Sequence, residues 1–291
     1  MDSQACSVLD IASAFEAAER GDFLGPNRSW NTINPHQAEF FRIFGTIRHL
    51  IPQLMADGLI DHEISWDAPV VNKWLAMKGF PMELTDQRKP DYFYVGSIYR
   101  QLIKWLVPGT ALDLVATNGR TYPGALLESG LSFYESRQGL VAAVATEGND
   151  VAYFMRMAYP DPGPFGLMKN AMAIQKQLTP VYKYGELLFP MVDLEVTTDV
   201  NWLVGANTVS QSGKNAKVAE AIQMSRLKLN QFAGLAESGF AMSMLMEAAF
   251  IRERMVINSP FLFWIDRPGV PIPMFTAWIK PDAWKNPGEI K

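Results

Sequence analysis

The side chains best suited to catalysis or metal binding are few and scattered along this chain. There are three histidines, His36, His49 and His62, and a single cysteine among 291 residues. The spacing of His49 and His62 does not match the pair of histidines one helical turn apart that binds zinc in many enzymes. We therefore expect His49 and His62 to be hydrogen-bonded histidines on helices, with Asp61 and Glu63 at a solvated helix end. A metal site is the weaker alternative.

Nucleophilic and phosphate-binding motifs are also missing from the sequence. No Gly-x-Ser-x-Gly turn and no glycine-rich phosphate loop occurs. Cys6 stands in an N-terminal segment that we expect to be flexible, which is a poor setting for an activated thiolate. The sequence thus favours a protein without catalytic residues, metal or cofactor, and an enzyme of unknown class ranks last.

Composition and charge narrow the classes of partner. Hydrophobic residues make up 48% of the chain, enough for a sizeable core, and the formal net charge is −4. This charge gives no reason to expect nucleic acid or an acidic membrane as a partner. The single cysteine excludes an internal disulfide. No secretory signal and no apolar run of about 18–20 residues is visible. We therefore expect a soluble protein, with the cytoplasm favoured.

The first 108 residues have mainly helical periodicity. Apolar residues recur at helical spacing over 7–20, 37–58, 67–78 and 92–107, which predicts four helices. The second of these should be broken or kinked at Pro52, because proline removes a helical hydrogen bond.

Beyond residue 108 the periodicity changes to alternation. Strands are predicted over 112–116, 140–145, 151–157 and 188–196, and one helix over 165–178. Helices first and strands after them favour an α+β fold.

The C-terminal part has a distinctive order of segments. An alternating, strand-like stretch over 222–230 leads into a Gly-, Ala-, Ser- and Met-rich segment over 234–249. Two apolar strands follow over 260–265 and 272–279, separated by the turn Asp-Arg-Pro-Gly at 266–269, whose residue types favour a hairpin turn.

This order resembles the C-terminal part of the serpin family. The segments that carry the resemblance are PFLFWI (260–265) and PMFTAWI (273–279), with LSFY (131–134), GNDVAYFM (148–155) and LFPMVDLE (188–195) further upstream. The resemblance implies a single serpin-like α+β domain over 1–291, β-rich and serpin-like over 109–291 and divergent and mainly helical over 1–108. It also implies that 67–78 corresponds to the helix that serpins place across their main sheet.

The resemblance further implies an exposed reactive loop that a protease cleaves. Counting back from the PFLFWI strand, the scissile bond falls near Ala248 or Ala249, and a shorter spacing moves it to Arg252 or Arg254. The implied function is a protease inhibitor or decoy with its bait around 246–254, and the implied partner is a protease. The alternative is a non-inhibitory scaffold that uses the same fold to bind another protein.

The hinge of this loop has an unusual composition. In inhibitory serpins the cleaved loop inserts into the main sheet, which requires small, uncharged residues on its inward face. If Gly234 is the hinge glycine, one register buries Glu237, at a cost of several kcal/mol for an unpaired charge. The other register buries Phe240 and two methionines. Whether this segment is an exposed bait or a partly packed strand stays open at this point.

Overall fold

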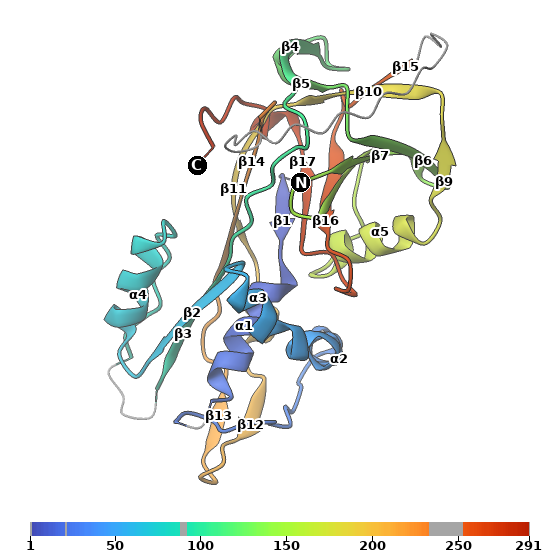
Figure 1. The fold of residues 1–291 in the computed structure, drawn as a ribbon. Helices are drawn as coiled ribbons and strands as arrows, with labels where there is room; N and C mark the ends of the chain where they lie inside the picture. Colours follow the sequence, from blue (N-terminus) through green and yellow to red (C-terminus); the bar gives the residue numbers. More distant parts are fainter. Residues whose placement is uncertain (1, 21, 88–91, 233–252, 291) are drawn as a thin grey trace. The chain divides into compact units, whose positions relative to one another are not determined.

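The structure is a computed structural model that describes residues 2–20, 22–87, 92–232 and 253–290 (Figure 1). Its internal contacts divide the chain into two compact units. One consists of residues 1–5, 102–195 and 226–291, and the other of residues 6–101 and 196–225. The expectation of a single domain with a border near residue 108 stays a prediction.

The first unit is built on a seven-stranded sheet. Its strand order is β1 (Gln4–Cys6), β17 (Phe275–Ile279), β16 (Phe261–Asp266), β8 (Val151–Arg156), β7 (Gly139–Ala145), β6 (Leu131–Ser136) and β9 (Thr179–Val181). From β17 to β9 every neighbouring pair is antiparallel. With five α-helices and several antiparallel sheets in the described part of the chain, the fold is α+β, as predicted.

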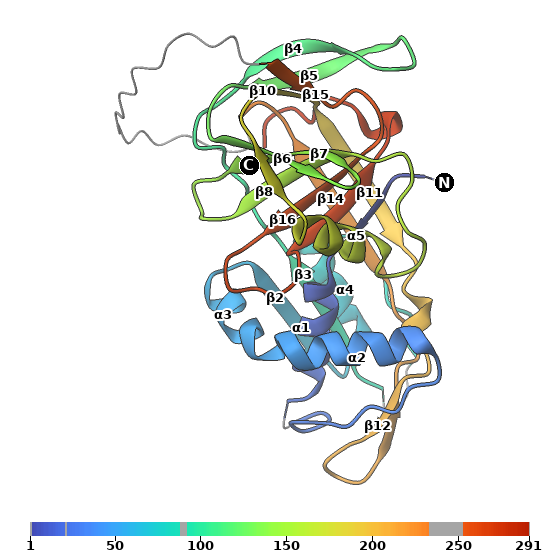
Figure 2. The same cartoon turned by 90° about the vertical axis from the view of Figure 1, so that its right-hand side faces the viewer.

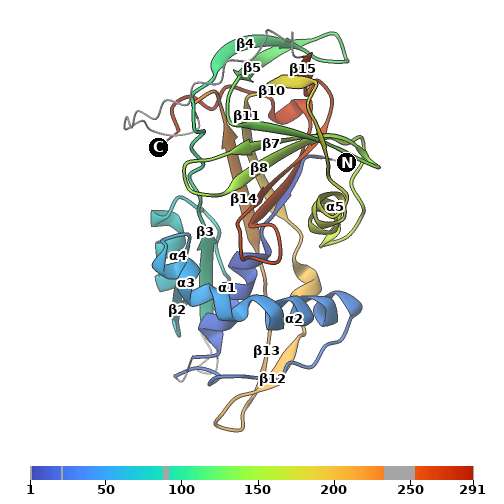
Figure 3. The ribbon, with the colours of Figure 1, turned by 45° about the vertical axis from the view of Figure 1, so that its right-hand side comes forward.

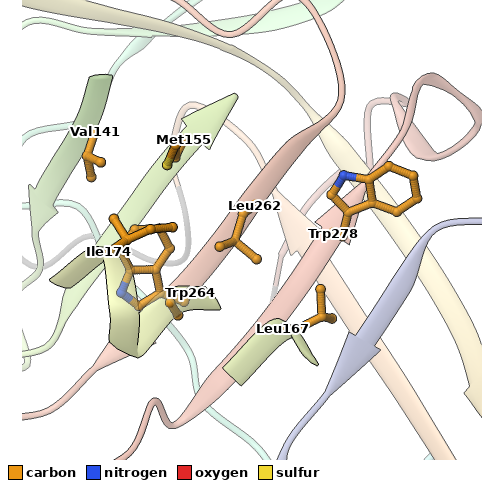
Figure 4. Close-up of a cluster of buried hydrophobic side chains, with 8 residues drawn as sticks. Val141, Met155, Leu167, Ile174, Leu262, Trp264 and Trp278 are labelled. Atoms are coloured by element: carbon orange, nitrogen blue, oxygen red, sulfur yellow. The ribbon is translucent and has the colours of Figure 1, made fainter. Parts of the chain in front are cut away.

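Strand β16 is buried on both faces, because a helix and a second aromatic layer cover it. Helix α5 (Gly166–Gln175) packs against β16 and β17 (Figure 2). Leu262 and Trp264 of β16 share a buried cluster with Leu167 and Ile174 of α5 (Figure 4).

The opposite face of β16 carries Phe261 and Phe263. Both rings contact Phe154 of β8, with centroids 6.1 and 5.1 Å away, and Phe154 in turn lies 4.8 Å from Phe189. The apolar strand predicted over 260–265 is therefore confirmed as β16. One face of this strand packs against helix α5, and the other packs against Phe154 of β8.

The hairpin between β16 and β17 turns where the sequence predicted. Gly269 has φ +87°, a left-handed conformation that glycine adopts without strain. The preceding Arg267 donates to both carboxylate oxygens of the buried Asp150, at 2.7 and 2.9 Å, which fixes the turn against the start of β8.

A second sheet of four strands belongs to the same unit. Its order is β15 (Glu253–Val256), β10 (Tyr184–Pro190), β5 (Thr121–Leu127) and β4 (Thr110–Val115). The strand predicted over 188–196 is in fact two strands, because the chain passes from β10 into β11 (Val192–Thr198) at Met191. Strand β11 forms a two-stranded ribbon with β14 (Gln223–Leu229), close to the predicted stretch over 222–230.

The second unit contains the N-terminal helices and two further ribbons (Figure 3). Its elements are α1 (Val8–Ala18), α2 (Pro35–Ile47), the 3-10 helix η1 (Arg48–Leu50), α3 (Ile51–Ala56), β2 (Ile60–Ser65), α4 (Ala68–Met77), β3 (Tyr94–Tyr99), η2 (Asn201–Leu203), β12 (Asn207–Val209) and β13 (Asn215–Lys217). Strand β2 pairs with β3, and β12 pairs with β13, both antiparallel.

Local signals explain where these helices begin. The Ser7 hydroxyl accepts from the backbone N–H of Leu9 at the start of α1, and the Asn34 side chain caps α2 in the same way. The helix expected over 37–58 is interrupted by η1, and Pro52 stands in the first turn of α3. Proline is tolerated there because the N–H that it lacks would have no helical partner.

The helix expected over 92–107 is wrong. Residues Tyr94–Tyr99 form strand β3, in which buried and half-buried residues alternate. The strand is stabilised by its partner β2 and by α4, which packs so closely that a Cβ on Gly96 would lie 2.9 Å from Val71. These partners are distant in sequence, and they overrode the weak helical periodicity.

Candidate functional site

The structure describes only the residues that flank the candidate reactive loop, so the assignment of the loop stays a prediction. Gly234, Glu237, Ala248, Ala249 and Arg252 lie outside the described residues. Arg254 is described, as is the chain up to Phe232. The geometry of the candidate site is therefore known only for the residues that flank the segment 233–252, which are the end of the chain that leaves β14 and strand β15.

The residues that directly precede the segment 233–252 are held by buried hydrogen bonds. The Trp105 indole donates to the carbonyl of Asn230 at 3.0 Å, and both residues are buried. The Asn230 amide donates to the carbonyl of Gly288 at 2.9 Å, while its oxygen accepts from the N–H of Phe232. The N–H of Gly109 donates to the carbonyl of Gln231 at 2.7 Å. The main chain that leaves β14 is thus fixed at consecutive residues.

The C-terminal end is held by a parallel strand pair. Strand β15 pairs with β10, and Arg254 lies beside Glu186 in that register. The Arg254 Nε lies 2.6 Å from the Glu186 carboxylate, and Lys183 lies 3.5 Å from Glu253. These ion pairs are exposed to solvent and contribute little, so the pairing of β15 with β10 rests mainly on the backbone hydrogen bonds of the strands.

The charge of Lys183 is supported by its neighbours. A hydrogen bond with Tyr184, followed in size by the Glu253 carboxylate, raises the pKa of Lys183 above its ordinary value. Its ammonium also lies 4.8 Å from the centre of the Tyr184 ring. Lys183 therefore stays charged at neutral pH. Its ammonium lies beside Glu253, the first residue of β15.

The placement of Arg254 affects its value as a cleavage site. A protease needs an accessible chain that is locally free of a sheet partner. Arg254 is in β15 and paired with β10, so cleavage there requires β15 to be released. The bait role of Arg254 remains a proposal.

The titratable groups that the sequence singled out are placed elsewhere than expected. Asp61, His62 and Glu63 lie in strand β2, not at a solvated helix end. His62 is buried, its Nδ1 lies 3.2 Å from the Ser13 hydroxyl, and its Nε2 has no hydrogen-bond partner among the described residues. Burial, aided by Arg20, lowers the pKa of His62 to about 4, so the ring is neutral at physiological pH.

Cys6 does not lie in a flexible terminus. It ends strand β1 directly before α1. Burial, followed by the nearby Asp10 carboxylate, raises the pKa of Cys6 to about 12. The thiol is therefore protonated and a poor nucleophile, for a different reason from the one expected.

Two further properties concern metals and membranes. Within residues 2–20, 22–87, 92–232 and 253–290, no three or more His, Cys, Asp or Glu side chains gather where a metal ion would bind. None of the described helices has both the length and the apolar character required to cross a bilayer.

Sequence reasoning missed the residues that anchor the loop. Trp105 stood at the end of a predicted helix, and nothing in the sequence paired it with Asn230, 125 residues later. The contact between Glu186 and Arg254 depends on a parallel pairing of distant strands. Opposite charge is the only signal that these two residues offer.

Comparisons with known proteins identify the fold. Thyroxine-binding globulin, solved in complex with thyroxine, superposes with a TM-score of 0.56 at 14% sequence identity, covering 96% of this chain and 92% of that one. Serpin48, described as a highly specific serpin of the insect Tenebrio molitor, gives the same TM-score and coverages at 11% identity. No protein-family model and no curated protein sequence matches the chain.

These superpositions show that the chain has the serpin fold over nearly its whole length. The resemblance first seen in the order of C-terminal segments is therefore confirmed at the level of fold. At these identities the likeness extends to fold alone, and it leaves activity and partner as proposals.

Proposed function

We propose that this protein acts on proteases as an inhibitor or decoy, without catalytic chemistry of its own, and presents residues 246–254 as bait. The observation that supports the proposal is the order of the residues that flank the segment 233–252. Asn230, before the segment, accepts a hydrogen bond from Trp105, and strand β15, after the segment, pairs with β10.

The reaction proposed is the first half of ordinary proteolysis. The nucleophile of the protease attacks the carbonyl of Ala248, Ala249, Arg252 or Arg254, and the amine of the following residue leaves. An acyl-enzyme remains. An inhibitor traps this ester or thioester, whereas a decoy is hydrolysed and released.

A panel of serine and cysteine proteases tests the proposal. We expect at least one of them to cut between residues 246 and 254 before it cuts elsewhere, and an inhibitor also forms a covalent complex that survives denaturing electrophoresis. With trypsin, the variants Arg252→Ala and Arg254→Ala serve as matched controls that remove one cleavage site each. First cuts at Arg28, Lys214 or Lys217 would remove the support for the bait.

The second candidate is a non-inhibitory scaffold that binds another protein. One observation favours it: Arg254 is held in β15 by its partner strand. If Gly234 is the hinge glycine, Glu237 also lies in the hinge, where its charge opposes insertion. A protein whose segment 246–254 resists the whole panel, and which forms no covalent complex, fits the scaffold and contradicts the bait.

A further inference from the structure

The second unit contains a partly open cavity to which no role has yet been assigned. Its volume is about 650 Å³. Helix α1 lines one side, and strand β3 with the chain preceding it lines another. Residues 215–223 line a third side. Cavities of 300–1,000 Å³ are typical of sites for small organic molecules.

The walls are mainly apolar and rich in aromatic rings. Phe15 comes from α1, Trp30 from the loop before α2, and Tyr92 and Phe93 from the chain leading into β3. Phe15 and Trp30 also meet edge to face, with centroids 4.8 Å apart, so that part of the wall is ordered by its own packing. Such a lining favours a flat, apolar ligand.

Two polar side chains of the lining form a group with unused acceptor capacity. The Gln223 amide nitrogen donates to the carbonyl of Ser7 at 2.8 Å and to the Asp10 carboxylate at 3.0 and 3.1 Å. Since all these partners are acceptors, they fix which side of the amide carries the nitrogen. The Gln223 oxygen is then buried without a hydrogen-bond partner among the described residues.

The polarity of this group selects the chemistry of a ligand. Asp10 and the Gln223 oxygen both accept hydrogen bonds, so a ligand group between them must donate. An apolar ligand would remove water from the half-exposed Asp10 carboxylate and would offer neither acceptor a hydrogen-bond donor. A carboxylate or phosphate would place negative charge beside Asp10. Burial raises the pKa of Asp10 to about 6, so this carboxyl is still mostly ionised at pH 7 and repels such an anion.

We propose that this cavity binds a small aromatic molecule that carries a hydroxyl or amine group, with the rings against Phe15 and Trp30 and the donor at Asp10 and Gln223. This inference does not depend on the proposed action on proteases, since it uses neither the segment 233–252 nor its anchors.

A matched series of naphthalene compounds tests the proposal on the full chain. The probes are 2-naphthylmethylamine, 2-naphthalenemethanol, 2-ethylnaphthalene and 2-naphthoate, and binding is measured by titration calorimetry and ligand-observed NMR. We expect the amine or the alcohol to bind about tenfold more tightly than the ethyl and carboxylate compounds. Equal affinities across the series, or no binding by any member, would overturn the proposal. This comparison needs no variant.

Variants then locate the binding site. Ala14 lines the cavity on α1, so Ala14→Phe fills it and should abolish binding, while Ala76→Phe on the exposed face of α4 should not. Gln223→Met removes one of the two acceptors and should reduce the preference for the amine or alcohol over the ethyl compound. Gln53→Met, at an exposed position of α3, is its control. Thermal unfolding checks that each variant is folded. Binding that survives Ala14→Phe, or a peptide of sequence 235–245 that binds where the aromatic probes do not, contradicts the proposal.

Discussion

The indole of Trp105 donates a 3.0 Å hydrogen bond to the carbonyl of Asn230, and both residues are buried in the same unit. The bond joins the chain before β4 to the end of β14, where the segment 233–252 starts. Trp105 also contacts Phe154 and Phe189, with centroids 6.3 and 6.1 Å away. One side chain thus connects the anchor of the candidate loop to the core.

Trp105→Phe should lower the free energy of unfolding by roughly 2–4 kcal/mol, because it leaves a buried carbonyl without its donor and a gap beside Phe154. Denaturant unfolding measures the change. Trp66→Phe is the control, since that indole is 52% exposed and its loss should cost below about 1 kcal/mol. Equal effects of the two substitutions would contradict an anchoring role for Trp105.

Phe261→Ala should destabilise the protein by roughly 3–5 kcal/mol, because the ring is fully buried and contacts both Phe154 and Trp284. Tyr182→Ala removes an aromatic ring that is 86% exposed and should change stability by less than about 0.5 kcal/mol. Both are measured by denaturant unfolding. Wild-type stability in the Phe261 variant would refute the burial of β16 on this face.

Asp266 should make stability depend on pH. Burial raises the pKa of its carboxyl from 3.8 to about 6, although hydrogen bonds from Trp264 and Gln175 act in the opposite direction. Between these two values the folded protein binds more protons than the unfolded chain. The stabilisation from this group is therefore complete below pH 3.8 and is lost as pH rises through 6.

Asp266→Asn removes this titration. Relative to the wild type, its free energy of unfolding should rise by roughly 2–3 kcal/mol between pH 4 and pH 7, since one pKa unit corresponds to about 1.4 kcal/mol. Unfolding curves at both pH values give the difference. Asp193→Asn, at an exposed position of β11, should show no comparable rise. A parallel pH dependence in the Asp266 variant and the wild type would contradict the prediction.

Cys6 should resist thiol reagents in the native protein. With a pKa raised to about 12, only about one thiol in ten thousand is ionised at pH 8, and the thiolate is the reactive form. Labelling with a maleimide, followed by mass spectrometry, should be slow until denaturant is added. Complete labelling of the folded protein within minutes would show that the end of β1 is open to solvent.

Cleavage between residues 246 and 254 should leave the melting temperature unchanged or lower it. Insertion of the cleaved hinge as a new strand would bury Glu237 in one register, or Phe240 and two methionines in the other, and neither is favourable. Calorimetry before and after cleavage measures the change. Glu237→Ala is the matched variant, and it should gain more heat stability on cleavage than the wild type does.

A rise of tens of degrees in the cleaved wild-type protein would contradict this prediction. Trapping by insertion would then become the leading mechanism of inhibition. Because these residues lie outside the described part of the chain, the prediction rests on their composition.

The sequence by itself determined the elements that local rules specify. Strand β16, the turn at Gly269, strand β14 and helices α1 and α4 lie close to where periodicity and turn chemistry predicted them. These features depend on residues within one or two turns of each other, so the signal is complete within the segment. The order of the C-terminal segments also pointed to the serpin fold before any tertiary contact was known.

Only the tertiary structure decided the features that depend on distant pairings. Residues Tyr94–Tyr99 became a strand because β2 and α4 lie against them. His62 became buried and Cys6 half-buried through contacts that their neighbours in sequence do not reveal. The pairs Trp105–Asn230, Glu186–Arg254 and Asp10–Gln223 each join segments far apart in the chain. Such contacts form when the whole chain packs, and so no local pattern encodes them.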